Sequence, residues 1–180
     1  MPHPLLNKPA PTITCPNADG EDFTFTPGAS GKPAVVFFVP SVGTYGCSRE
    51  MCGFRDQLVD GSAFSDKAVD LIGLGPNPVK DIKTWVTDNN INYTVLSDEK
   101  GEARKAFQCG KGLMGLSEGR ISFVIDNKGI VRDVMDSVIN YNGHVKFALK
   151  TIEKLNGESK PVAEATPTTT APPAEPTPSS

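Results

Sequence analysis

The sequence predicts an α/β domain in which helices cover both faces of a mixed central sheet. Three observations predict it. Two apolar, β-branched runs at residues 34–39 and 69–74 have the composition of strands buried on both faces. An amphipathic segment at residues 47–58 separates them, as a crossover helix would. Further along, two strand-like segments are joined by residues 126–129 (DNKG), a sequence typical of a hairpin turn.

The first elements follow from local patterns in the chain. Residues 22–26 (DFTFT) alternate polar and apolar side chains, which predicts a half-buried strand that ends at Pro27-Gly28. The buried strand at residues 34–39 stops at Pro40. In residues 47–58, apolar side chains recur every three or four positions, which predicts a helix.

The second half of the domain alternates strands and helices in the same way. The predicted elements are a strand at residues 69–74, a helix at 79–86, a strand at 93–96, a helix at 102–107, strands at 121–125 and 130–134, and a helix at 143–155. The strands at 34–39 and 69–74 should be parallel neighbours with a right-handed crossover, whereas the hairpin adds antiparallel strands. This arrangement is that of the thioredoxin-like class.

The composition indicates one domain and a polar tail. The 180 residues suffice for one domain with a sizeable core, which we place at residues 1–157. Residues 158–180 are rich in proline and threonine and have too few apolar side chains to offset the cost of ordering, so we expect a disordered tail. Of the net charge of −3, Glu164 and Glu175 in the tail contribute −2. A nearly neutral domain argues against nucleic acid as a partner.

Other function classes are disfavoured by what the sequence lacks. The longest apolar run is far shorter than the ~20 residues of a membrane helix, and no secretory signal is visible. We therefore expect no membrane partner and a cytoplasmic location, with the nucleus as the alternative. The four cysteines show no Cys-x-x-Cys spacing and are accompanied by two histidines, so we expect no metal site. Residues 110–115 match a dinucleotide-loop pattern but follow a helix instead of a strand, so we expect no nucleotide cofactor either.

Cys47 stands where α/β sheets gather functional groups. The strand at residues 34–39 delivers the chain to the carboxyl edge of the sheet, and Cys47 falls in the first turn of the next helix. Unpaired N–H groups and the positive end of the helix dipole favour a thiolate there. Thr44 can offer a hydroxyl three residues before the sulfur, and Pro40 shields one wall without offering an N–H. From these residues alone, an inert buried cysteine is an equally good interpretation.

At this point the chain resembles a known family. Residues 37–56, FFVPSVGTYGCSREMCGFRD, look like the active-site stretch of peroxiredoxins, with Pro-x-x-x-Thr-x-x-Cys ending at Cys47. A second cysteine five positions later, Cys52, is similar to the PrxQ or bacterioferritin-comigratory branch. Residues 119–126 (GRISFVID) resemble the family strand whose arginine, here Arg120, reaches the reactive sulfur. The resemblance extends from about residue 6 to residue 155.

The resemblance implies a monomeric thiol peroxidase that reduces hydrogen peroxide and organic hydroperoxides without a cofactor. The Cys47 thiolate would attack one peroxide oxygen, with the Thr44 hydroxyl, the Cys47 N–H and the Arg120 guanidinium stabilising the developing charge. Cys52 would then resolve the sulfenic acid as an intramolecular disulfide. Thioredoxin or a similar dithiol protein would reduce that disulfide.

Helix geometry adds an expectation about resolution. Five helical residues span ~7.5 Å along the axis, beyond the ~7 Å Cα separation that a disulfide tolerates. The helix must therefore open in each cycle, and Gly46 and Gly53 would make this easier. Glu50, one turn after Cys47, could orient Arg120 or Arg55, or be a solvated carboxylate.

Alternative interpretations remain open at the level of sequence. The same cysteines could serve a redox sensor or thiol relay that passes a disulfide to a partner protein, and the third alternative is an inactive interaction module. Cys109 is the second candidate for the resolving thiol, and Cys15 is expected to be a small core residue. His144, at the start of the last helix, is expected to be solvated.

Overall fold

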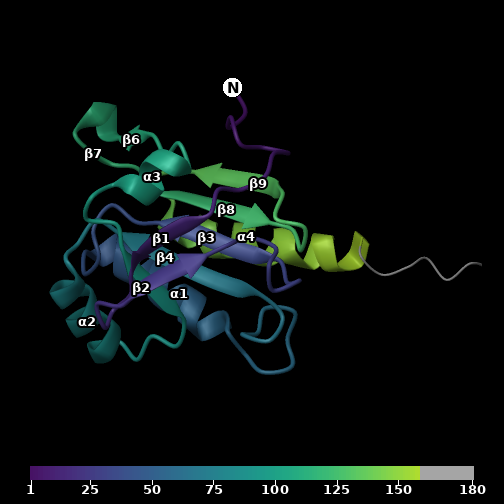
Figure 1. The fold of residues 1–180 in the computed structure, drawn as a ribbon, viewed down its shortest axis with the longest axis horizontal. Coiled ribbons are helices and arrows are strands. Elements are labelled where there is room, and N and C mark those ends of the chain that lie inside the picture. Colours follow the sequence, from purple (N-terminus) through teal and green to yellow (C-terminus); the bar gives the residue numbers. More distant parts are fainter. Residues whose placement is uncertain (159–180) are drawn as a thin grey trace, which may run out of the picture.

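A five-stranded mixed sheet forms the centre of the protein, which we describe for residues 1–158 from a computed structural model (Figure 1). The strands lie in the order β5-β4-β3-β8-β9, with bounds β3 (Ala34–Phe38), β4 (Asp70–Gly75), β5 (Thr94–Ser97), β8 (Ile121–Ile125) and β9 (Val131–Asp136). β3, β4 and β5 are parallel, which confirms the predicted pairing of the first two, while β8 and β9 add antiparallel strands. The predicted tail, from residue 159 onward, lies outside the described residues.

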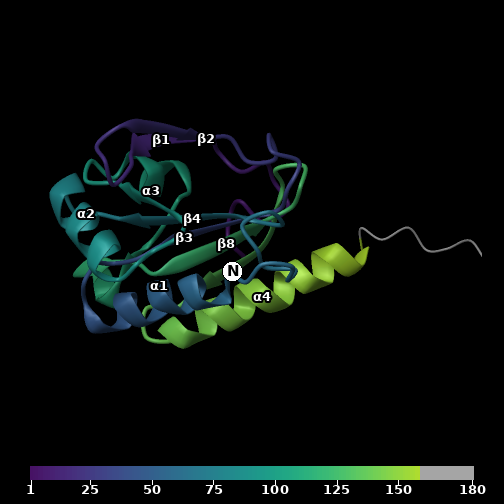
Figure 2. The same ribbon diagram turned by 90° about the horizontal axis from the view of Figure 1, so that it is seen from below.

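Helices cover both faces of the sheet, as predicted. Figure 2 shows α1 and α4 side by side under the sheet, with the β1–β2 pair and α3 above it. The bounds are α1 (Tyr45–Gln57), α2 (Val79–Asp88) and α4 (Tyr141–Glu158) for the helices of one face, and β1 (Ile13–Pro16), β2 (Asp22–Phe25) and α3 (Glu102–Ala106) for the other face. The sheet is thus the middle layer of three.

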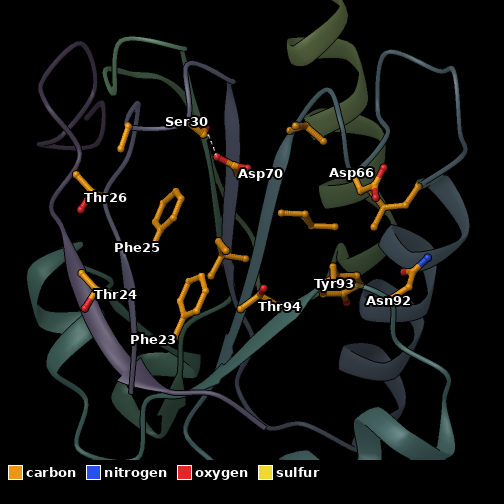
Figure 3. Close-up of a pocket in the computed structure, with 15 residues that line it drawn as sticks. Phe23, Thr24, Phe25, Thr26, Ser30, Asp66, Asp70, Asn92, Tyr93 and Thr94 are labelled. Atoms are coloured by element: carbon orange, nitrogen blue, oxygen red, sulfur yellow. Dashed lines mark hydrogen bonds between the residues drawn. The ribbon is translucent and has the colours of Figure 1, made fainter. Parts of the chain in front are cut away.

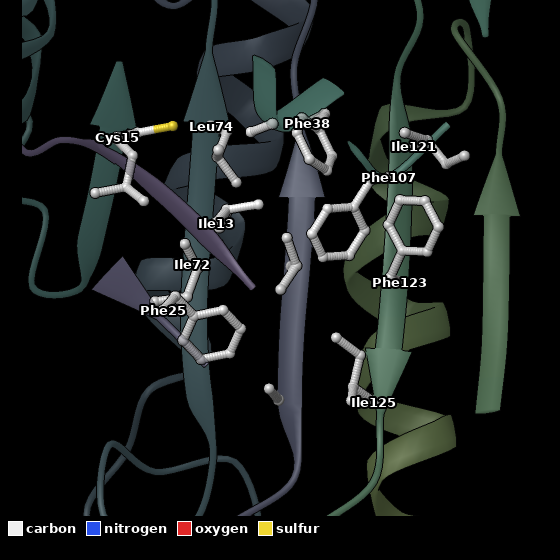
Figure 4. Close-up of a cluster of buried hydrophobic side chains, with 14 of the residues drawn as sticks. Ile13, Cys15, Phe25, Phe38, Ile72, Leu74, Phe107, Ile121, Phe123 and Ile125 are labelled. Carbon is white, nitrogen blue, oxygen red and sulfur yellow. The ribbon is translucent and has the colours of Figure 1, made fainter. Parts of the chain in front are cut away.

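β3 contributes to both hydrophobic cores, which explains why its sequence is apolar throughout. Its side chains alternate between the two faces, and all five residues are buried. On one face Phe38 packs with Phe107 and Phe123 (Figure 4). On the other, the Phe37 ring stacks on Phe54 of α1 at a centroid distance of 4.5 Å. The strand therefore holds α1, the helix that carries Cys47, firmly against the sheet.

The turn of the predicted hairpin is confirmed, whereas β1 and the small β6–β7 pair were not predicted from the sequence. The hairpin between β8 and β9 turns at Gly129, which has a φ of 81°, and the Asp126 carboxylate accepts the N–H groups of Lys128 and Ile130. β1 was not predicted. The dinucleotide-like stretch instead forms a small antiparallel pair, β6 (Lys111–Gly112) and β7 (Ser117–Glu118), joined by the 3-10 turn η1 (Leu113–Gly115).

Candidate active site

Cys47 lies in the first turn of α1, where the sequence places it. β3 ends at Phe38, and a short loop leads to Thr44, the residue that precedes the helix. The thiol is buried, and the first turn holds no acidic side chain that would oppose a negative charge on the sulfur. The positive end of the helix dipole therefore acts on the sulfur without a competing carboxylate in that turn.

Arg120 reaches Cys47 across 73 positions of sequence. It immediately precedes β8, and its Nη2 donates a hydrogen bond to the Cys47 sulfur at 3.3 Å. Its Nε donates to the carbonyl of Val138 at 3.0 Å, and its Nη1 pairs with Glu50. Burial lowers the pKa of Arg120, but the charge of Glu50, together with Cys47, outweighs it, so the guanidinium stays protonated. A permanent positive charge thus contacts the sulfur, as the family resemblance led us to expect.

Glu50 is a buried partner of Arg120, which decides between the interpretations left open for it. Its side chain is fully buried on the sheet side of α1 and accepts a hydrogen bond from Arg120. Arg55 instead pairs with Asp56, so the solvated and the Arg55-directed alternatives are both wrong. Burial raises the pKa of Glu50 to about 8, although the charge and hydrogen bond of Arg120 oppose this shift.

His144 is buried beside this cluster, and the expectation of a solvated side chain is wrong. In α4, its Nδ1 lies 2.8 Å from the Ser122 hydroxyl and 3.9 Å from Glu50 Oε1, and its Nε2 lies 2.9 Å from the carbonyl of Ser137. Burial lowers the pKa of His144 to about 4, so the ring is neutral near pH 7. The sequence at the helix start gave no sign that this side chain is buried, because its contacts come from β8, from α1 and from the residue after β9.

The loop before Cys47 is held by hydrogen bonds of its own. The Asn77 side chain accepts the Val42 N–H at 2.7 Å, and Pro40 is half-buried after β3. The Thr44 hydroxyl donates to the carbonyl of Ser41 at 3.0 Å. This bond occupies the proton that the sequence interpretation assigned to the peroxide, so the predicted role of Thr44 requires the hydroxyl to rotate.

α1 is also tied to its neighbours just beyond Cys47. The indole Nε1 of Trp85, in α2, donates to the Ser48 hydroxyl at 3.2 Å. The Tyr93 hydroxyl donates to the carbonyl of Met51 at 2.8 Å. Gly46 lets Arg120 approach closely, since a Cβ at this position would lie 3.3 Å from Nη2.

Arg104 is a second buried arginine near the site, and sequence reasoning missed it. From α3 it donates to the carbonyl of Gly119 at 3.0 Å and to that of Val39. These carbonyls belong to the residues directly before Arg120 and Pro40. One guanidinium therefore links the two chain segments that form the site.

We expect the Arg104→Met variant to lose about 2–6 kcal/mol of unfolding free energy, because two buried carbonyls lose their donor at about 1–3 kcal/mol each. Urea unfolding measures this loss. Arg104→Lys should recover part of it, and Lys105→Met, at an exposed position of the same helix, should have little effect. A loss below about 0.5 kcal/mol, typical of a surface substitution, would show that Arg104 does not hold the segments together.

The other cysteines lie away from the Arg120 cluster or are deactivated by burial. All four cysteines are free thiols. Cys52 faces the other side of α1, where its sulfur lies 3.9 Å from the Asn89 side chain. Burial raises the pKa of Cys15 to about 11 and that of Cys109 to about 12, which keeps both protonated near neutral pH. Cys15 is a core residue, as expected.

A separate pocket lies at the opposite end of the sheet. It has a volume of about 450 Å³ and is bounded by β2, the start of β4 and Tyr93 (Figure 3). No cysteine lines it, and the hydrogen bond between Ser30 and Asp70 crosses its edge. In residues 1–158, His, Cys, Asp and Glu side chains form no group of three able to hold a metal. None of the helices described is long and apolar enough to cross a membrane.

Comparisons with known proteins identify the relatives of this chain. The AhpC/TSA family model matches residues 6–134. Peroxiredoxin Q, chloroplastic, of Suaeda salsa is 30% identical over 145 residues, which cover 81% of this chain and 66% of the plant protein. The crystal structure of peroxidoxin BcpB from Mycobacterium tuberculosis superposes with a TM-score of 0.71 at 27% identity, over 83% of this chain and 97% of that one. Peroxiredoxin Q of Xanthomonas campestris, at 21% identity and a TM-score of 0.67, over 79% of this chain and 90% of that one, supports the fold.

The chain belongs to the AhpC/TSA family, because the family model covers most of it and the site residues converge as described. Its fold is thioredoxin-like. Within the family, it is a peroxiredoxin of the PrxQ or bacterioferritin-comigratory type, in agreement with the resemblance in its sequence. The chain spans slightly less than two thirds of the length of the chloroplastic relatives that it matches.

Proposed function

We propose that this protein is a thiol peroxidase that reduces hydrogen peroxide and organic hydroperoxides through Cys47. The observation that carries the proposal is the 3.3 Å contact between Arg120 Nη2 and the Cys47 sulfur at the start of α1. A guanidinium and a helix start beside the sulfur favour negative charge on it, and a thiolate is the nucleophile that peroxides require.

The first step forms one bond and breaks one. The Cys47 thiolate attacks one peroxide oxygen, the O–O bond breaks, and the other oxygen leaves as hydroxide or alkoxide, which takes a proton from water. Negative charge moves from sulfur to the leaving oxygen. Arg120, which already contacts the sulfur, and the N–H groups at the start of α1 are placed to stabilise that charge. The product is the sulfenic acid of Cys47.

Cys52 resolves the sulfenic acid by forming a disulfide with Cys47 and releasing water. Both residues lie in α1, five positions apart, so they point about 140° apart around the helix axis. The bond requires the first turns of α1 to open, which breaks the contact of Ser48 with Trp85. The disulfide is then reduced by thioredoxin or a similar dithiol protein, and the protein acts as a monomer. We further propose a cytoplasmic location.

Stopped-flow mixing of the reduced protein with hydrogen peroxide, then with thioredoxin and its reductase, tests the proposal. We expect one peroxide to be consumed per protein at once and continued turnover when the reductant is present. The alternative is a thiol relay. In that case the disulfide would be transferred to a partner protein faster than thioredoxin reduces it. A protein that does not consume peroxide would contradict the proposal.

We expect Arg120→Met to slow peroxide attack by about 10²–10³-fold, because it removes a preorganised donor and a positive charge at the sulfur. The second-order rate constant of the stopped-flow reaction measures this. Arg49→Met serves as the control, since Arg49 is exposed on α1 and its guanidinium lies 6.0 Å from the Tyr45 ring, away from the cluster. If Arg120→Met reacted at the native rate, the contact with sulfur would have no catalytic role.

A further inference from the structure

Arg120 lies between two acids that compete for its charge. Its Nη2 contacts the Cys47 sulfur, and its Nη1 contacts the Glu50 carboxyl. If the thiol and the carboxyl were both ionised, two negative charges would share one guanidinium in a site where all three side chains are buried. Burial makes an unbalanced charge costly, so one of the two acids should keep its proton.

The surroundings of Glu50 indicate which acid that is. Oε2 accepts the hydrogen bond from Arg120, but Oε1 is buried and has no hydrogen-bond partner within residues 1–158. A carboxylate anion needs donors on both oxygens to compensate for burial. An unpartnered, buried oxygen is instead a favourable place for a proton.

His144 keeps that oxygen without a donor. The carbonyl of Ser137 can only accept, so the hydrogen of the neutral His144 ring is on Nε2. Nδ1 therefore carries a lone pair, which accepts the hydroxyl proton of Ser122 at 2.8 Å. Glu50 Oε1 thus faces a lone pair at 3.9 Å, not an N–H, and the Ser122 proton is directed away from it.

We propose that Glu50 holds the proton that Cys47 gives up, because the arrangement of His144 and Ser122 leaves its Oε1 without a donor. The proton leaves the Cys47 sulfur and is bound by the Glu50 carboxylate, so the charge of the cluster does not change. Arg120 then pairs with a thiolate and a neutral acid. This inference rests on the proposed role of Cys47 as the nucleophile.

The other charged groups around Glu50 do not change this balance. Tyr93 interacts with Glu50, but burial raises its pKa well above the ordinary value, so it stays neutral. Arg104 interacts electrostatically with Cys47, but its positive charge is already paired with a carboxylate, because Glu118 lies 3.9 Å from its Nη1. His144, on the third packed element, is neutral near pH 7 because burial lowers its pKa to about 4.

The test measures the alkylation of Cys47 by iodoacetamide as a function of pH. It uses the full chain in which Cys15, Cys52 and Cys109 are replaced by serine, so that one thiol reacts. Glu50→Gln keeps an acceptor for Arg120 and presents an N–H₂ to His144, as the protonated acid would. Because glutamine reproduces the neutral acid, we expect the pH midpoint of alkylation to stay within about 0.3 units of the native value, whereas removal of an ionised Glu50 would lower it by about one unit. Glu153→Gln, at an exposed position of α4, should leave the midpoint unchanged.

Ser122→Ala supplies the second variant, and it tests the hydrogen-bond arrangement around the Glu50 acid. A protonated carboxyl gives an infrared C=O stretching band, which Glu50→Gln should remove. Without the Ser122 hydroxyl, Nδ1 is free to accept a hydrogen bond from the Glu50 acid, so this band should move to lower frequency while the alkylation midpoint stays at the native value. A merely structural role for Ser122 would lower the melting temperature without moving the band.

A midpoint that falls by about one unit in Glu50→Gln would overturn the inference, since it would mean that an ionised Glu50 opposes the thiolate in the native protein. A midpoint that rises would also overturn it, since it would mean that the carboxylate supports the thiolate. If Glu50→Gln did not fold, the infrared band of the Glu50 acid in the native and Ser122→Ala proteins would decide, and its absence at neutral pH would overturn the inference. Alkylation needs no peroxide, so a failure of the peroxidase proposal would appear separately, as a protein with the expected pH profile that does not consume peroxide.

Discussion

Replacing Cys47 with serine is expected to abolish peroxide consumption. A serine hydroxyl at this position keeps its proton at neutral pH, and no other thiol is placed to substitute for it. Cys15 and Cys109 have pKa values raised by burial, and the sulfur of Cys52 faces away from Arg120. The loss should therefore be complete and not partial.

A peroxide assay on purified variants measures this loss. Cys15→Ser and Cys109→Ser are the matched controls, and each should keep the native first-turnover rate. Circular dichroism should show the same fold and a similar melting temperature for Cys47→Ser, since one sulfur is exchanged for one oxygen. Peroxidase turnover in Cys47→Ser would exclude Cys47 as the nucleophile.

Replacing Cys52 with serine is expected to stop the cycle after its first step. The variant should consume one equivalent of peroxide as fast as the native protein, because Cys52 does not contact the Arg120 cluster. It should then fail to turn over with thioredoxin, because no disulfide forms. Under excess peroxide, the trapped sulfenic acid should proceed to sulfinic acid, which mass spectrometry detects.

The native protein provides the positive control for resolution. After one equivalent of peroxide it should lose two hydrogens in mass and give a Cys47–Cys52 crosslinked peptide. Dithiothreitol should restore turnover to Cys52→Ser, since a small thiol can reach the sulfenic acid directly. A Cys47–Cys109 crosslink, with normal turnover of Cys52→Ser on thioredoxin, would move the resolving role to Cys109.

The larger part of the fold could be predicted from local patterns. The central strand was visible because β3 is buried on both faces and therefore apolar at each position. The hairpin was visible because its turn residues are those that the backbone requires. β1 was missed because it has four residues and ends at a proline, and its burial comes from packing against the sheet and α3.

The site could be predicted only in part, because several of its residues lie far apart in the sequence. Cys47 could be placed because strand, loop and helix start are consecutive. Arg120 needed the family resemblance, since 73 positions separate it from Cys47. His144 and Arg104 were missed because each lies on a helix whose local sequence looks solvated, and their burial results from residues elsewhere in the chain. Periodicity carries no signal for a polar side chain that is buried by tertiary contacts.

The hydrogen bond between Trp85 and Ser48 offers an optical test of the proposed Cys47–Cys52 disulfide. Trp85 is the one tryptophan of the chain, so its fluorescence is not mixed with that of another indole. Its partner, Ser48, directly follows Cys47, and the opening of α1 that a disulfide requires must separate the two. The emission of Trp85 should therefore change when the disulfide forms and return when it is reduced, so that each half of the proposed cycle can be timed in the unlabelled protein.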